Sequence, residues 1–186
     1  MAKVFEEIDD DLRRWIEEQP VWFTATAPLA GDGRVNVSPR GGDSFSVLGP
    51  HRVGWVDFTG SEVETVAHLR ENGRICVMFA SFGHRPRIVR LHGRGEVHLP
   101  GTAGFAEVVA RHPENPSTRA VITVDVERVS DACGWGVPVM EVVTGERDLI
   151  RRNAEKKGPE GMDAYRELKN SRSLDGLPGL PGLRGP

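Results

Sequence analysis

The chain has little cysteine and no long apolar run. Its only two cysteines among 186 residues, Cys76 and Cys133, are far apart and form no CxxC pattern. This favours reduced thiols in the cytoplasm over a disulfide framework. The apolar runs are too short to span a bilayer, and the acidic N-terminal stretch lacks the apolar region of a signal peptide. We therefore expect a cytoplasmic protein with no membrane partner.

An excess of positive charge and the common catalytic motifs are also missing. With a net charge of -3, the chain is not expected to bind nucleic acid. It contains no GxxxxGK[ST] phosphate loop, no GxSxG nucleophile motif and no HExxH pair. His92 and His98 are an even number of positions apart and would face the same side of a strand. A solvated sheet face explains this spacing better than a metal site does. The catalytic residues therefore stay unassigned, and no metal site is expected.

The composition that is present fits one soluble globular domain, with 38% hydrophobic and 27% charged residues. Ile8, Leu12, Trp15 and Ile16 fall at helical spacing before Pro20, which predicts a helix near residues 6–18. Short apolar runs between Gly/Pro turns then predict strands at 21–27, 35–39, 44–48, 52–58, 74–80, 87–99 and 119–129.

Strands with one polar face and hairpin-length turns indicate an antiparallel sheet that curls into a barrel. Two further helices are expected within it. One spans 61–73, with Ser61 and Glu64 as an S-x-x-E capping box and Gly73 at its end. The other spans about 103–112. The fold class is therefore expected to be mainly β with flanking helices.

The amino-acid pattern changes after residue 143 from strand-like to helical and charged. Charged segments at 146–157 and 162–170 predict two helices, and the end reads DGLPGLPGLRGP. We interpret this end as an extended, mobile or partner-wrapping tail, because so few Gly-x-y triplets cannot hold a collagen helix. The expected division is a barrel domain over 1–143, and helices with a tail over 144–186 that pack on it or on a dimer partner.

Three positions suit an anion. Arg40 follows a strand that places Asn36 and Ser38 on one face, and two glycines beside it let the backbone bend closely. The turn from Phe58 to Ser61 feeds a helix, whose free N–H groups favour phosphates. Arg85 and Arg87 begin a later strand. Each position also has a simpler interpretation, because Ser61 could only cap its helix and the arginines could be solvated or paired with surface carboxylates.

Four motifs occur in an order that resembles a known family. They are VNVSPRG, a strand ending in DFTG, SEVETVAHLRENGRICVMF, and RPRIVRLHGRGEV. The ordered set resembles the pyridoxamine 5'-phosphate oxidase superfamily over about residues 20–130, most clearly over 34–99. The resemblance implies an antiparallel, Greek-key split β-barrel that binds FMN, as a homodimer with the cofactor at the interface. CGWGVP (133–138) and DGLPGL (175–180) further resemble a less characterised branch related to the oxidase.

The resemblance implies roles for individual residues. Arg40 takes the place of the family's phosphate-binding lysine, whereas the family's Arg-Lys pair falls on Glu64 and Thr65, with the loss of two positive charges. Arg87 replaces a glutamine near the flavin ring, and Trp135 lies where a tryptophan reaches the cofactor from the other subunit. Together with the anion-suited positions, the expected cofactor-binding set is Ser38, Arg40, Phe58, Thr59, Ser61, Thr65, Arg87 and Trp135.

The implied function is that of an FMN-dependent oxidoreductase acting on an unassigned small-molecule substrate or electron donor. Oxidation of pyridoxamine phosphate itself is less expected, because the family's C-terminal segment rich in arginine and histidine is missing. Two alternatives stay open. One is a deazaflavin (F420)-dependent reductase, and the other is a non-catalytic dimeric module that binds FMN or haem.

Overall fold

The computed structural model describes residues 3–142, 148–183 and 185. The strands are β1 (Val4–Phe5), β2 (Val21–Thr26), β3 (Asn36–Gly41), β4 (Phe45–Gly49), β5 (Arg52–Phe58), β6 (Arg74–Ala80), β7 (Ile88–His98) and β8 (Thr118–Ala132). The helices are α1 (Asp10–Glu17), α2 (Glu64–Asn72), α3 (Ala103–Val109) and α4 (Leu149–Asn170). Every strand predicted from the sequence is present, and only the short β1 is additional.

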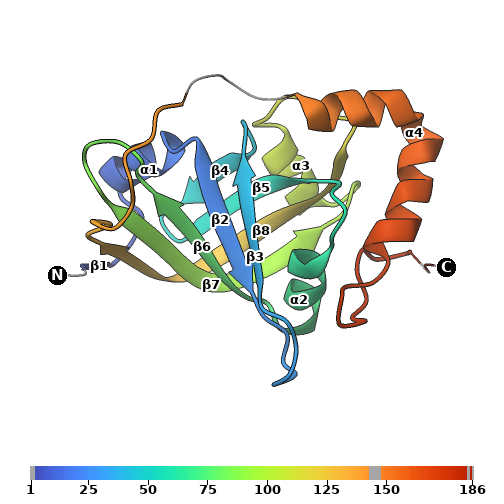
Figure 1. The fold of residues 1–186 in the computed structure, drawn as a ribbon, viewed down its shortest axis with the longest axis horizontal. Coiled ribbons are helices and arrows are strands. Elements are labelled where there is room, and N and C mark those ends of the chain that lie inside the picture. The colour runs from blue at the N-terminus through green and yellow to red at the C-terminus, as the bar shows by residue number, and fades with distance from the viewer. Residues whose placement is uncertain (1–2, 143–147, 184, 186) are drawn as a thin grey trace.

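The strands form one antiparallel sheet that curls into an open barrel (Figure 1). The order is β3-β2-β6-β7-β8-β5-β4, with β1 added on β8. Strands β3 and β4 follow each other in the chain but stand at the two ends of this order. The barrel is therefore split between them, which confirms the predicted split-barrel class with flanking helices.

Aromatic side chains fill the barrel interior. Trp22, Trp55 and Phe79 are almost fully buried. The ring centroids of Trp22 and Trp55 lie 5.1 Å apart in an edge-on arrangement, and Phe45 packs edge-on against Trp22 and Phe79. Such edge-to-face contacts add to the free energy gained from burial. Trp55 and Phe79 are thus core residues.

Helix α1 closes one end of this core. Its N-cap residue is Asp9, whose carboxylate accepts a hydrogen bond from the Leu12 N–H at 2.8 Å. Leu12 and Ile16 are buried and join the same apolar cluster as the barrel aromatics. The sequence periodicity that predicted this helix therefore marks the face that packs on the barrel.

Helix α2 is present, but its predicted capping box is wrong. The helix begins at Glu64, its N-cap is Val63, and no side chain caps it. The Glu64 carboxylate instead accepts from the Val63 N–H at 3.0 Å and from the Leu174 N–H at 3.0 Å. The end was predicted correctly, since Gly73 adopts the left-handed conformation there, with φ 70°.

The C-terminal part packs on α2 and on the turn before it (Figure 1). Helix α4 is broken at Gly158, which has φ 66° and precedes Pro159, so the two predicted helices meet at a kink. The start of the first predicted helix at 146, and the proposed boundary at 143/144, lie outside the described residues.

The tail has contacts of its own within the chain. Leu180 is buried, and its N–H donates to the Asn170 carbonyl at 2.9 Å. Asp175 pairs with Arg34, and the Arg70 guanidinium donates to the carbonyls of Pro178 and Gly179. These bonds hold residues 174–180 on their own chain, which is one of the two placements expected for the tail, and contact with a dimer partner stays a prediction.

No helix in the described parts of the chain has both the length and the apolar character needed to cross a membrane. Within the same residues, histidine, cysteine, aspartate and glutamate form no group of three or more that could hold a metal ion.

Candidate functional site

A buried carboxylate between two arginines lies at the end of the barrel. Asp57, near the end of β5, is completely buried. It forms an ion pair with the Arg40 guanidinium from β3, and its second oxygen accepts from Nε of Arg119 at 2.7 Å. The Arg40 guanidinium also lies 5.6 Å from the Trp55 ring centroid. We call Arg40, Asp57 and Arg119 the charge cluster.

The two arginines favour the ionised form of the Asp57 carboxylate. Burial alone would raise the pKa of Asp57, but the positive charges and hydrogen bonds of Arg119 and Arg40 outweigh burial and lower it. The result is one negative and two positive groups, with a net charge of one positive. Such a surplus favours a further anion nearby.

A hydrogen-bond network extends from the charge cluster toward α2. Arg40 Nη2 donates to the Thr65 hydroxyl at 3.2 Å, and the Asn36 amide donates to the same oxygen at 3.0 Å. The Ser38 hydroxyl donates to the side-chain amide oxygen Oδ1 of Asn36 at 3.0 Å. Ser38, Arg40 and Thr65, three of the residues expected to contact the cofactor, are therefore brought together in space.

The network corrects one expectation about Arg40. The sequence analysis gave Arg40 as a residue that binds an anion or as a solvated residue. The structure instead places its side chain mostly inside the protein, 16% exposed, against a carboxylate of the same chain. Asp57 is the residue that sequence reasoning missed, although an aspartate in the apolar run RVGWVDF is a signal for a buried ion pair.

The turn after β5 is held by the C-terminal helix. The Thr59 hydroxyl donates to the Ser117 carbonyl at 2.8 Å and accepts from Arg166 Nε at 3.0 Å. Asn170 donates to the Gly60 carbonyl at 3.1 Å. Ser61 is exposed next to this turn and does not cap α2. Helix α4 thus fixes the position of Thr59.

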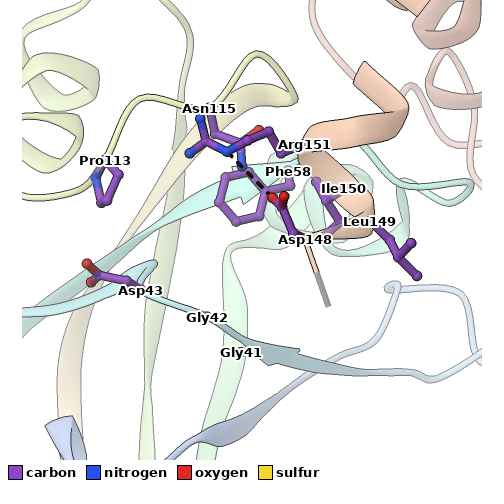
Figure 2. Close-up of a pocket in the computed structure, with 10 residues that line it drawn as sticks. All are labelled: Gly41, Gly42, Asp43, Phe58, Pro113, Asn115, Asp148, Leu149, Ile150 and Arg151. Carbon is purple, nitrogen blue, oxygen red and sulfur yellow. Dashed lines mark ion pairs between the residues drawn. The ribbon is translucent and has the colours of Figure 1, made fainter. Parts of the chain in front are cut away.

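A cavity of about 390 Å³ opens beside this turn (Figure 2). Pockets of this size accept small-molecule ligands. Phe58 lines its centre, and the glycines that follow Arg40 line its lower edge in the view. An ion pair of Asp148 and Arg151, with Oδ1 and Nε 3.7 Å apart, lies next to Phe58 in the view. The complete lining is Gly41, Gly42, Asp43, Phe58, Pro113, Asn115, Asp148, Leu149, Ile150 and Arg151.

Arg87 and Trp135 form a separate group near the other end of β8. The Arg87 guanidinium pairs with Asp131 at 3.3 Å and lies 5.0 Å from the Trp15 ring centroid. Gly134 has φ 64°, and a Cβ built on it would lie 3.1 Å from the Arg87 backbone, so the two segments are in close contact. Trp135 itself is 83% exposed.

Among the described residues, no hydrogen bond, ion pair or ring contact joins Arg87 or Trp135 to the group around Arg40. Across the sheet, Arg40 pairs with Trp22, Trp22 with Phe79, and Phe79 with Val89. Arg40 and Val89 are therefore three strand spacings apart, about 14 Å, and Arg87 lies two residues before Val89 in the chain. The eight predicted residues therefore fall into two groups, which we call half-sites. One holds Ser38, Arg40, Phe58, Thr59, Ser61 and Thr65, and the other holds Arg87 and Trp135.

Comparisons with known proteins agree with the fold. Residues 8–133 match the family model described as pyridoxamine 5'-phosphate oxidase. A pyridoxamine 5'-phosphate oxidase family protein of Aspergillus flavus is 42% identical over 96% of this chain and 78% of its own length.

Solved structures show the same architecture at low sequence identity. HupZ of Group A Streptococcus superposes with a TM-score of 0.51 and 22% identity, over 66% of this chain and 91% of that one. The FAD binding protein of Mycobacterium smegmatis superposes with a TM-score of 0.50 and 12% identity, over 70% and 98%. These two likenesses support the fold alone.

Proposed function

Because the chain belongs to the pyridoxamine 5'-phosphate oxidase family, we propose that it is an FMN-binding flavoprotein. In this proposal it is a cytoplasmic homodimer with the cofactor at the interface. It acts as an oxidoreductase on an unassigned small-molecule substrate or electron donor. The membership supports a flavin ligand, and the FAD binding protein of M. smegmatis is a split-barrel neighbour with a flavin in its name.

The separation of the two half-sites is the observation that carries this proposal. Arg40 and Thr65 face one end of the barrel, while Arg87 and Trp135 gather at another place on the same chain. A second copy of the chain can bring its own Arg87 and Trp135 to the first half-site. A cofactor that needs both groups would then bind only to the dimer.

Exposed apolar side chains support a dimer. Trp135 is followed by Val139, Met140 and Val142, and each of the four is more than half exposed. Val37 is also exposed, on β3 at the split of the barrel. Exposed apolar side chains gathered in this way are typical of interfaces in soluble proteins. One group of them lies in the segment after Gly134, which contacts Arg87, and Val37 lies on β3 with Arg40, so the proposed interface includes both half-sites.

The net charge of the charge cluster favours the FMN phosphate, but acidic side chains of the same chain weaken this attraction. The charge cluster keeps one positive charge in excess, and the Thr65 hydroxyl lies beside Arg40. Against this, Glu64 stands at the start of α2, where free N–H groups would otherwise suit a phosphate. We therefore assign Arg40 the main phosphate contact and expect weaker phosphate binding than an uncompensated arginine would give.

A bound flavin supplies the redox chemistry, because its ring accepts or donates a hydride. The residues of this chain would then bind and orient it. Arg40 and Thr65 would hold the anionic end, and Trp135 of the second copy would cover the ring from water. No side chain need act as a strong acid or base, which agrees with the lack of a catalytic motif.

The visible absorption spectrum of the purified protein tests the proposal. Oxidised FMN gives bands at about 370 and 450 nm, whereas a single band near about 420 nm would indicate deazaflavin and a sharp Soret band would indicate haem. Light scattering should give twice the chain mass. A colourless protein that does not bind added FMN would refute flavin binding, and a flavin-loaded monomer would refute only the interface.

A further inference from the structure

A cavity of about 610 Å³ lies outside both half-sites, between α3, β5 and the start of α4. Its apolar wall includes Val56 of β5, which is almost fully buried, and Phe105 and Val109 of α3, which are half-buried. None of the eight residues predicted for the cofactor lines it. We call it the α3 cavity. Its volume is in the range of pockets that hold small organic molecules.

The α3 cavity is open to solvent along α3 and the loop that follows this helix. Ala106, Ala110 and Pro113 all line it, and each of them is exposed. A ligand can therefore reach the apolar wall without displacing a buried side chain. A wall made of aromatic and aliphatic side chains suits a hydrocarbon group, because the ligand and the wall both lose apolar contact with water.

Arg151 of α4 stands where the α3 cavity meets the cavity of Figure 2, since it lines both. Its Nη2 donates to the Glu114 carbonyl at 2.9 Å, whereas its Nε lies 3.7 Å from Asp148 Oδ1, too far for a hydrogen bond. Within the described part of the chain, Nη1 and the second N–H of Nη2 therefore have no acceptor. Two parallel N–H groups of a guanidinium are the donors that bind a carboxylate with two hydrogen bonds.

The charges around Arg151 favour an anion. Asp148 is shared between two arginines, because Nε of Arg152 also lies 3.4 Å from Asp148 Oδ2. One carboxylate thus faces two guanidinium groups, which leaves a positive surplus. The side chain of Glu114 also lines the α3 cavity but is exposed, so water and salt screen its charge. The cavity therefore combines an apolar wall with a cation that has donors to spare.

We propose that the α3 cavity binds an apolar carboxylic acid, of the kind represented by medium-chain fatty acids. The hydrocarbon chain lies against Phe105 and Val109, and the carboxylate accepts hydrogen bonds from Arg151 at the junction of the two cavities. The proposal does not rest on flavin binding, because the residues that form this site are separate from those assigned to the cofactor.

Isothermal titration calorimetry with octanoate tests the charged contact, and octanol serves as the uncharged ligand of the same chain length. The ratio of octanoate affinity to octanol affinity should fall at least about tenfold in Arg151→Ala, because only octanoate makes a charge-assisted hydrogen bond. Arg152→Ala is the matched control, since Arg152 pairs with the same Asp148 but lines neither cavity. The control should keep the ratio within about twofold. An unchanged ratio in Arg151→Ala would overturn the role of Arg151.

A second substitution tests the cavity itself. Ala106 is exposed on α3 and lines the cavity, so Ala106→Phe occupies its space without removing a core contact. Octanoate affinity should fall at least about tenfold, with the circular dichroism spectrum unchanged. An affinity equal to that of the unchanged protein would place octanoate elsewhere, and no octanoate binding by the unchanged protein would overturn the proposal. The titrations are made before and after FMN is added, and the visible spectrum reports FMN binding separately.

Discussion

Replacing Asp57 by asparagine should destabilise the protein more than any comparable surface change. The substitution keeps the size of the side chain but removes the negative charge between Arg40 and Arg119. Asp57 is completely buried and the Arg119 side chain is only 5% exposed, so the two guanidinium groups lose a partner that water cannot replace. Breaking a buried ion pair in this way costs about 3–5 kcal/mol.

The magnitude within this range depends on the remaining partners. Arg119 also donates to the Glu62 carbonyl at 2.9 Å, and Arg40 also donates to the hydroxyls of Thr24 and Thr65. The amide oxygen of an asparagine can accept one of the lost bonds. We therefore expect about 3 kcal/mol, the lower end of the range for a broken buried pair.

Urea unfolding followed by fluorescence measures this loss. The matched control is Asp125→Asn, which removes an 83% exposed carboxylate whose contact to Arg52 is 3.9 Å. The control should change the free energy of unfolding by less than about 1 kcal/mol. A loss of less than about 1 kcal/mol in Asp57→Asn as well would refute the view that the charge cluster stabilises the fold.

The difference in free energy of unfolding between the parent protein and Asp57→Asn should depend on pH. The pKa of Asp57 is lower in the folded chain than in the unfolded chain, because the two arginines outweigh burial. Its stabilisation is therefore complete above the unfolded pKa of about 3.9 and is lost as the pH falls through the folded value. The difference between the parent protein and Asp57→Asn should be constant near neutral pH and shrink below about pH 4.

Three further predictions follow from other parts of the structure. Arg40→Ala should weaken FMN binding by about 2–3 kcal/mol in a fluorescence titration, while Arg94→Ala, an exposed control paired with Glu127, should not. Leu180→Ala should lower the free energy of unfolding by about 2–3 kcal/mol in urea, because this buried side chain anchors the tail. Trp135→Ala should shift light scattering toward the monomer, and an unchanged dimer would remove Trp135 from the interface.

The barrel was predictable because its signals are local. Each strand appeared in the sequence as a short apolar run between turn residues, and the runs follow one another as an antiparallel sheet requires. Gly73 marked the end of α2 for the same reason, since a left-handed residue favours glycine.

The contacts of the site were less predictable because they are distant in sequence. The partners of Asp57 lie 17 and 62 positions away, and no spacing rule joins them. The capping box failed for a similar reason. Glu64 has the type and spacing of a capping residue, but Leu174, 110 positions away, competes for its carboxylate.

The charge cluster shows what the sequence could and could not say about Arg40. An arginine beside two glycines suits an anion, and the structure does give it one, but the anion is Asp57 of the same chain. A flavin phosphate would have to share Arg40 with this carboxylate. Its affinity therefore depends on the surplus of charge over the whole cluster and not on Arg40 alone. Two arginines against one aspartate leave that surplus positive, and this balance is what keeps an anionic cofactor compatible with a buried acid at the site.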